Sequence, residues 1–163
     1  MTAEPFKPAL RDRIADPGRI TLPEDLVRLV DQLVGEAEPR AVWSCVSERE
    51  GGHRTASVRW VAVVGKWLVE LDADFESPLE PSGRAAMGGG LAPEGVRQAR
   101  ALPLSTVTAV TLAEPCPWNP DRSVWEVRFT AGEVVRLGGG AFRAISTVGD
   151  PTQVVAAIRE ARG

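Results

Sequence analysis

The chain has 163 residues, of which 44% are hydrophobic and 25% are charged, and its formal net charge is −3 at pH 7. A domain of this length buries about 68–70% of the surface of its unfolded chain, so it needs no disulfide or metal to fold. The acidic balance argues against binding of nucleic acid or anionic lipid, because both depend on a surplus of basic charge. The basic residues are 17 arginines and only 2 lysines, a bias typical of GC-rich bacterial genomes.

The two cysteines, Cys45 and Cys116, match no metal-binding spacing. Cys45 lies in an apolar stretch, where a free thiol behaves as a small hydrophobic side chain. The sequence contains no apolar run near the roughly 18 residues of a membrane span, and its polar start has no signal-peptide core. We therefore expect a cytoplasmic protein with free thiols.

The first 18 residues are polar and proline-containing, and they predict a flexible N-terminal arm. A capping box follows, in which the Thr21 hydroxyl and the Glu24 side chain each satisfy a backbone amide of the first helical turn. Apolar residues then recur at helical spacing until Gly35. The pattern predicts an amphipathic helix over residues 22–34, whose apolar side covers its own sheet or binds a partner.

The segment Gly-Arg-Ile-Thr-Leu-Pro at residues 18–23 resembles the opening of the AbrB-type swapped-hairpin DNA-binding domains. The resemblance implies DNA binding through the N-terminal segment. The acidic balance of the chain opposes it, so DNA binding is kept as a further alternative.

Strand patterns begin with residues 40–48, which place Val42, Ser44 and Val46 on one face and Trp43, Cys45 and Ser47 on the other. Residues 56–72 are two apolar, β-branched runs separated by Gly65 and Lys66. Period-two alternation places each set of side chains on one face of a strand. This stretch predicts the central hairpin of a curved antiparallel sheet, with Gly65 at a positive-φ position of the turn.

The side chains of this hairpin carry further expectations. Its first strand is apolar on both faces, so it should be central and covered on both sides. Both tryptophans, Trp60 and Trp67, are expected in the core, where large aromatic rings dominate the packing energy. On the return strand, Glu70 and Asp72 are expected to face water.

Residues 73–96 are rich in glycine and proline and predict a long loop, either disordered or functional. The glycine run at residues 88–90 is not a phosphate-binding loop, because no Lys-Ser or Lys-Thr follows it. A functional loop would cover a site for a small molecule or for catalysis.

Strand patterns then return at residues 97–113, 123–130, 133–137 and, as a weak edge strand, 141–148. Pro103 interrupts the first of them, which therefore lies at an edge or ends at a bend. Asp150 is a favourable N-cap and Pro151 a favourable first helical residue. We expect a final amphipathic helix over residues 151–162.

The stretch Leu-Pro-Leu-Ser-Thr-Val-Thr-Ala-Val at residues 102–110 resembles a motif common in bacterial pleckstrin-homology-like (PH-like) domains. The hairpin at residues 125–137 and the last helix follow in the order of that family. The resemblance covers residues 40–163. It implies a mainly β fold, a partly open antiparallel barrel capped by a C-terminal helix, here with an extra N-terminal helix in a single domain at residues 19–163.

The lipid-binding members of this family carry a basic cluster on the first hairpin loop. Here that loop, at residues 48–54, holds two arginines and two glutamates and no lysine, so we expect no phosphoinositide binding. His53, in the same loop, is the only histidine and the only neutral-pH base of its kind. No catalytic triad, metal-ligand spacing or cofactor motif accompanies it, and we expect no cofactor.

The sequence therefore favours a non-catalytic interaction or scaffold domain that binds a protein partner or itself. Its candidate partner-binding residues are His53, Arg54, Arg59, Cys116 and Trp118. The alternative is a small-molecule-binding or enzymatic β-barrel with its site under residues 73–96.

Overall fold

The computed structural model describes residues 24–48, 55–76, 91–119, 122–139 and 144–162. These residues form two α-helices, one 3-10 turn and eight strands, and the fold is mainly β. In chain order the elements are α2 (Glu24–Val34), β1 (Ala41–Glu48), β2 (Thr55–Val64), β3 (Trp67–Glu76), β4 (Leu91–Pro103), η1 (Leu104–Thr106), β5 (Val107–Glu114), β6 (Val124–Phe129), β7 (Val134–Gly138), β8 (Ala144–Val148) and α3 (Pro151–Arg162).

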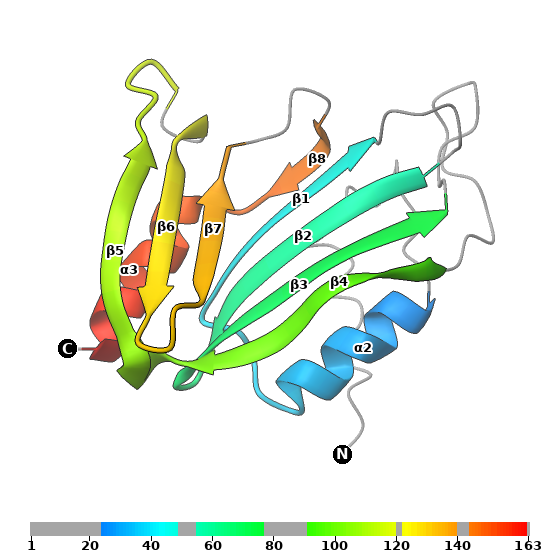
Figure 1. The fold of residues 1–163 in the computed structure, drawn as a ribbon, viewed down its shortest axis with the longest axis horizontal. Helices are drawn as coiled ribbons and strands as arrows, with labels where there is room; N and C mark the ends of the chain where they lie inside the picture. The colour runs from blue at the N-terminus through cyan, green and yellow to red at the C-terminus, as the bar shows by residue number, and fades with distance from the viewer. Residues whose placement is uncertain (1–23, 49–54, 77–90, 120–121, 140–143, 163) are drawn as a thin grey trace.

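The strands form two antiparallel sheets, and the described strands close no barrel. The large sheet has the order β4-β3-β2-β1-β8, and the small sheet has the order β5-β6-β7. The chain passes from one sheet to the other through η1, directly after Pro103. Figure 1 shows the small sheet over one end of the large sheet, with α3 behind it and α2 beside β4. The expected partly open, two-sheet architecture with a C-terminal helix is confirmed.

Strand β2 is the middle strand of the large sheet and is covered on both faces, as its apolar sequence predicts. Val61 and Val63 point to the inner face, toward the small sheet, whereas Trp60 and Ala62 point to the outer face; all four are fully buried. The turn to β3 has the expected geometry, since Val64 pairs with the first residue of β3 and Gly65 has a φ of 57°.

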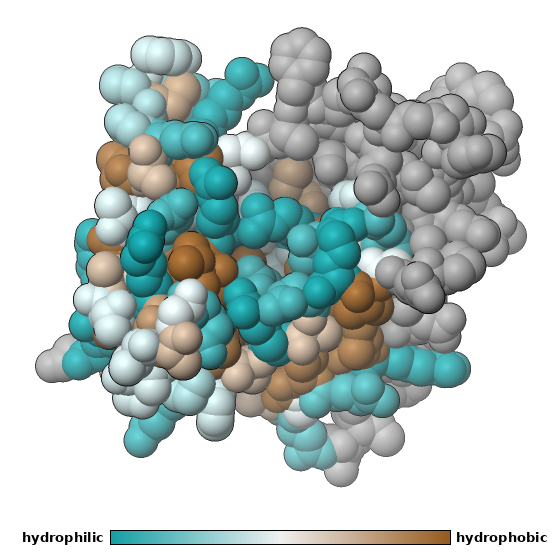
Figure 2. Space-filling view, viewed as in Figure 1, coloured by the Kyte–Doolittle hydropathy of each residue, from teal (hydrophilic) through white to brown (hydrophobic). Residues whose placement is uncertain are grey.

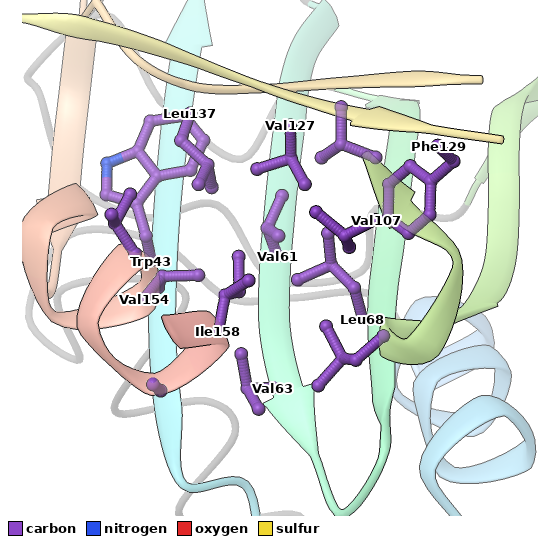
Figure 3. Close-up of a cluster of buried hydrophobic side chains, with 14 of the residues drawn as sticks. Trp43, Val61, Val63, Leu68, Val107, Val127, Phe129, Leu137, Val154 and Ile158 are labelled. Carbon is purple, nitrogen blue, oxygen red and sulfur yellow. The ribbon is translucent and has the colours of Figure 1, made fainter. Parts of the chain in front are cut away.

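The core lies between the inner face of the large sheet, the small sheet and α3 (Figure 3). Val61 and Leu68 of the large sheet, Val127 of the small sheet and Ile158 of α3 are all fully buried there. Figure 3 shows these side chains converging from three layers on one apolar cluster. An isolated helix of this length is marginal in water, so α3 depends on this contact.

Both helix ends predicted from local sequence are confirmed where the structure describes them. Helix α2 ends at Gly35, which has a φ of 67° and donates from its amide to the carbonyl of Asp31 at 2.9 Å. At the start of α3, the Asp150 carboxylate accepts from the Thr152 amide at 2.8 Å. This bond satisfies one of the amide donors that the first helical turn leaves without an intrahelical partner.

Trp60 is fully buried, as expected, on the outer face of the large sheet, whereas two other expectations about the central hairpin are wrong. Trp67, at the end of the sheet, is 48% exposed. Glu70 does not face water: it is 5% exposed, because β4 places the guanidinium of Arg100 beside it. Asp72 is likewise paired, with Arg97. The alternation of side chains correctly predicted which residues share a face of the strand. It could not predict which other elements cover each face, because that depends on the tertiary structure.

The loop predicted for residues 73–96 is shorter than expected, because β3 continues to Glu76 and β4 begins at Leu91. Residues 77–90 lie outside the described residues, as do the N-terminal arm, the Thr21 capping box, the segment at residues 18–23 and the hairpin loop at residues 49–54. Among the described residues, no helix is long and apolar enough to cross a membrane.

The account of α3 predicts a large difference between its two faces. Ile158→Ala removes a fully buried side chain from the core and should cost about 2–5 kcal/mol of unfolding free energy. The matched control is Gln153→Ala on the exposed face of the same helix, which should cost about 0.5 kcal/mol or less. Urea denaturation of both variants measures the difference. Equal, small effects would show that α3 is not part of the core.

Candidate functional site

The residues predicted to contact a partner do not form one site. His53 and Arg54 lie outside the described residues. Arg59 lies on the inner face of the large sheet, where its guanidinium donates to the Arg136 carbonyl at 2.8 Å and stands 5.9 Å from the centroid of the Trp43 ring. Arg59 thus joins the two sheets. This structural role accounts for its position, and no partner protein is needed to explain it.

Cys116 and Trp118 lie together in the turn that follows β5. The turn is held by the Cys116 amide, which donates to the Ser123 hydroxyl at 2.9 Å, and by the Asn119 amide, which donates to the Cys116 carbonyl at 3.1 Å. Trp118 is 84% exposed, the highest value among the exposed large hydrophobic side chains that the structure describes. These two predicted residues therefore flank one end of β5.

The inner face of the large sheet changes character along its length, from the apolar core to a charged cluster. In this cluster, Arg100 donates from Nε to Glu70 at 2.9 Å, and Arg97 bonds both Asp72 and Asp74. Figure 2 shows hydrophilic side chains gathered across the middle of this side of the molecule, between the small sheet and α2. The positive and negative charges pair within the cluster, so its role is to stabilise the fold.

The same cluster protects the free edge of β7. Arg100 donates to the Val134 carbonyl at 3.1 Å, and Arg59 donates to the Arg136 carbonyl at 2.8 Å. Both carbonyls point away from β6, so two arginines of the large sheet occupy the acceptors that another strand would need. Blocking of edge groups in this way prevents unwanted strand pairing.

The two edges of the large sheet are protected differently. Strand β4 contains Pro93 and Pro103, has two register shifts against β3, and is contacted by α2. Prolines and bulges are common devices for blocking an edge. Strand β8 is only five residues long, and short edge strands offer little to a pairing partner.

The direction of the backbone groups of β5 follows from the hydrogen bonds of its neighbours. The carbonyls of Val134 and Arg136 point away from β6. The residue between them, Val135, therefore directs its backbone groups toward β6, where it pairs with Val127. Successive residues of a strand direct their backbone groups to opposite sides. Glu126, next to Val127, therefore directs its groups to β5.

Strand β5 consequently presents a free edge. Glu126 pairs with Thr111, so Thr111 bonds to β6, and its neighbours Val110 and Leu112 turn their N–H and C=O groups outward. No described strand pairs with this edge. The strand contains no proline, and its first charged residue is Glu114, at its end. Unlike the other three edges, β5 carries none of the protecting features described above except the register shifts at its two ends.

An open groove of about 660 Å³ lies at the start of β5. Trp67 is among its lining residues, and the hairpin is fixed there by the Leu104 amide, which donates to the Lys66 carbonyl at 2.9 Å. The side chains of Lys66 and Arg162 are exposed and have no ion-pair partner among the described residues. The groove is lined by Lys66, Trp67, Pro103, Leu104, Ser105, Ala161 and Arg162.

Further along β5 the exposed surface is apolar. Leu112 is 41% exposed and pairs with Trp125 of β6, which is partly buried. The Arg159 guanidinium of α3 stands 5.8 Å from the centroid of the Trp125 ring, in the range of a cation–π contact. The edge of β5 is therefore bordered by an apolar side chain, an aromatic ring and a cation.

A second groove, of about 450 Å³, lies between α2 and the outer face of the large sheet. Its walls are mainly apolar, with Leu33 and Val34 on the helix and Val64, Val69 and Ala101 on the strands. It marks an incomplete contact between helix and sheet and gathers few polar groups. Among the described residues, no three His, Cys, Asp or Glu side chains form a group able to hold a metal ion.

The sequence did not point to Lys66, Arg162 or Leu112 as site residues. Lys66 and Arg162 are nearly a hundred positions apart, and only the fold brings both to the start of β5. Leu112 follows the strand alternation and therefore resembles a core residue. It is nevertheless 41% exposed, near the end of β5.

The charged cluster makes a prediction about pH. Burial raises the pKa of the Glu70 carboxyl above its ordinary 4.5, and the attraction of Arg100 and Arg59 offsets this only in part. A carboxyl with a raised pKa holds its proton more tightly in the folded state, so its contribution to stability falls as the pH rises above 4.5 and through the raised pKa.

The test compares the wild type with Glu70→Gln by urea denaturation from pH 4.5 toward neutrality. The unfolding free energy of the wild type minus that of the variant should decrease as the pH rises. A difference that increases with pH would show that the two arginines outweigh the burial of the carboxylate.

Comparison of the chain with protein-family models, curated proteins and solved structures finds no match.

Proposed function

We propose that this chain is a non-catalytic interaction domain of the PH-like type, which binds an extended segment of a partner protein along the free edge of β5. The observation that carries the proposal is the outward direction of the backbone groups of Val110 and Leu112. In strand addition, main-chain hydrogen bonds to such an edge supply affinity, and alternate side chains of the bound segment supply specificity.

The surroundings of β5 support this function. Exposed apolar side chains lie at the edge and just beyond its end, at Leu112 and Trp118. Figure 1 shows β5 as the outermost strand of the small sheet, with α3 behind it. A bound segment would therefore have the backbone of β5 on one side, with α3 behind that strand.

The PH-like assignment rests on the order of the elements: antiparallel hairpins in two sheets, a crossover at η1 and a C-terminal helix that completes the core. Strand β8 and helix α2 are additions to that order. We propose the cytoplasm of a bacterium as its location, because Cys45 and Cys116 form no disulfide and the composition is rich in arginine.

The experiment begins with selection of extended peptides from a random display library against the full chain. Binding of each selected peptide is then measured by fluorescence anisotropy to the wild type, Leu112→Pro and Leu112→Val. Proline removes an outward N–H without breaking a β5–β6 bond, and valine keeps both the N–H and an apolar side chain. We expect Leu112→Pro to weaken binding about tenfold or more, and Leu112→Val to change it little.

A test from the ligand side does not depend on the folding of a variant. N-methylation of alternate peptide amides should abolish binding at the positions that face β5 and leave it unchanged at the positions between them. Peptides that bind Leu112→Pro as well as wild type, and that tolerate every N-methyl group, would contradict strand addition. A wild-type dimer that Leu112→Pro converts to monomer would contradict the binding of a partner segment, because the edge would then be occupied by a second copy.

A further inference from the structure

We infer that the β5 edge selects an acidic segment: an extended partner strand, antiparallel to β5, with an apolar side chain beside Leu112 and a carboxylate side chain in the groove at the start of β5. The inference rests on the proposed function and adds to it the chemistry and direction of the partner. It is carried by the charges that line the groove.

Three cations border this surface, and the described residues offer none of them an ion-pair partner. Lys66 and Arg162 line the groove itself, and Arg159 lies over the Trp125 ring. The nearest negative charge along α3, Glu160, is bound by Arg40 at 3.2 Å. The net charge of the chain is −3, so this positive surface is a local feature that a basic partner would not match.

The direction of the partner follows from the direction of β5. The strand runs from the groove, at Ser105, toward Glu114. The small sheet is entirely antiparallel, and antiparallel pairing is slightly more stable than parallel pairing. An antiparallel partner strand therefore enters near Glu114 and runs down to the groove, so that its later residues approach Lys66 and Arg162.

The spacing within the partner follows from the same geometry. Opposed residues of an antiparallel pair run in opposite directions. On β6, the residues opposite Leu112 and Val107 are Trp125 and Phe129, four positions apart, because β5 has a register shift just after Val107. The partner residue opposite Val107 should likewise come about four positions after the one opposite Leu112. Ser105, before Val107, already lines the groove. The carboxylate should therefore follow the apolar residue by about five positions or slightly more.

The test uses the peptides selected against the full chain, all with amidated C-termini, so that only a side chain supplies a carboxylate. The sequences should be enriched in Asp or Glu about five positions after an apolar residue. For individual peptides, replacing this residue by Lys should weaken binding to the wild type about fivefold or more. Lys66→Glu and Arg162→Glu should each reduce the preference for the acidic peptide, and the double variant should prefer the Lys peptide.

The matched control is Arg122→Glu, which makes the same change of charge on an exposed arginine at the other end of β5. It should leave the preference for the acidic peptide unchanged. An equal effect of all three reversals would mean that net charge, and not the groove, sets the preference, and would overturn the inference.

Two further outcomes distinguish failure of this inference from failure of the proposed function. Peptides that require Leu112 but bind equally with Asp or Lys would overturn the acidic preference and leave strand addition standing. Acidic peptides that bind equally to Leu112→Pro would overturn strand addition, and with it the stated direction of the partner. If only peptides with a free C-terminal carboxylate bind, the side-chain assignment is wrong.

Discussion

The structure depends on one apolar contact, in which the inner face of the large sheet packs against the small sheet and α3. Val61, Leu68, Val127 and Ile158 are fully buried there and come from four separate elements. This contact fixes where the small sheet and α3 lie on the large sheet. Its consequence is local: the turn between β2 and β3, the start of β5 and the end of α3 meet around one groove. These three segments lie far apart in the sequence.

The charged half of the same face determines which strand edges are open. Beyond the apolar core, Arg59 and Arg100 reach across to the carbonyls of β7, and their own positions are held by Trp43 and Glu70. Sequence alternation alone would predict that these charged side chains face solvent. In the structure they connect the two sheets. They block the edge of β7, whereas prolines and register shifts disturb β4. The free edge of β5 stands out because the other three edges are protected.

Local sequence predicted the elements well, because their signals are local. The alternation around Val61, the N-cap at Asp150 and the glycine at the end of α2 depend on a few neighbouring residues, and all three are confirmed. The errors concern which surface covers a side chain. Trp67 and Glu70 lie on the faces that alternation gives them. The exposure of Trp67 goes with the incomplete contact between α2 and the outer face of the large sheet, whereas the burial of Glu70 depends on Arg100 of β4. The groove residues could not be predicted for the same reason.

The most direct test of this account is amide hydrogen exchange of the full chain, followed by NMR at low protein concentration. If the edge of β5 is free, the amides of Val110 and Leu112 should exchange quickly, while that of Thr111, between them, is protected through its pairing with Glu126. The amides of β6, which has a strand on each side, should all be protected. Uniform protection of Val110, Thr111 and Leu112 would contradict the account, since the edge would then already be covered. Protection of Val110 and Leu112 with fast exchange at Thr111 would show that the assigned direction of the β5 backbone is wrong.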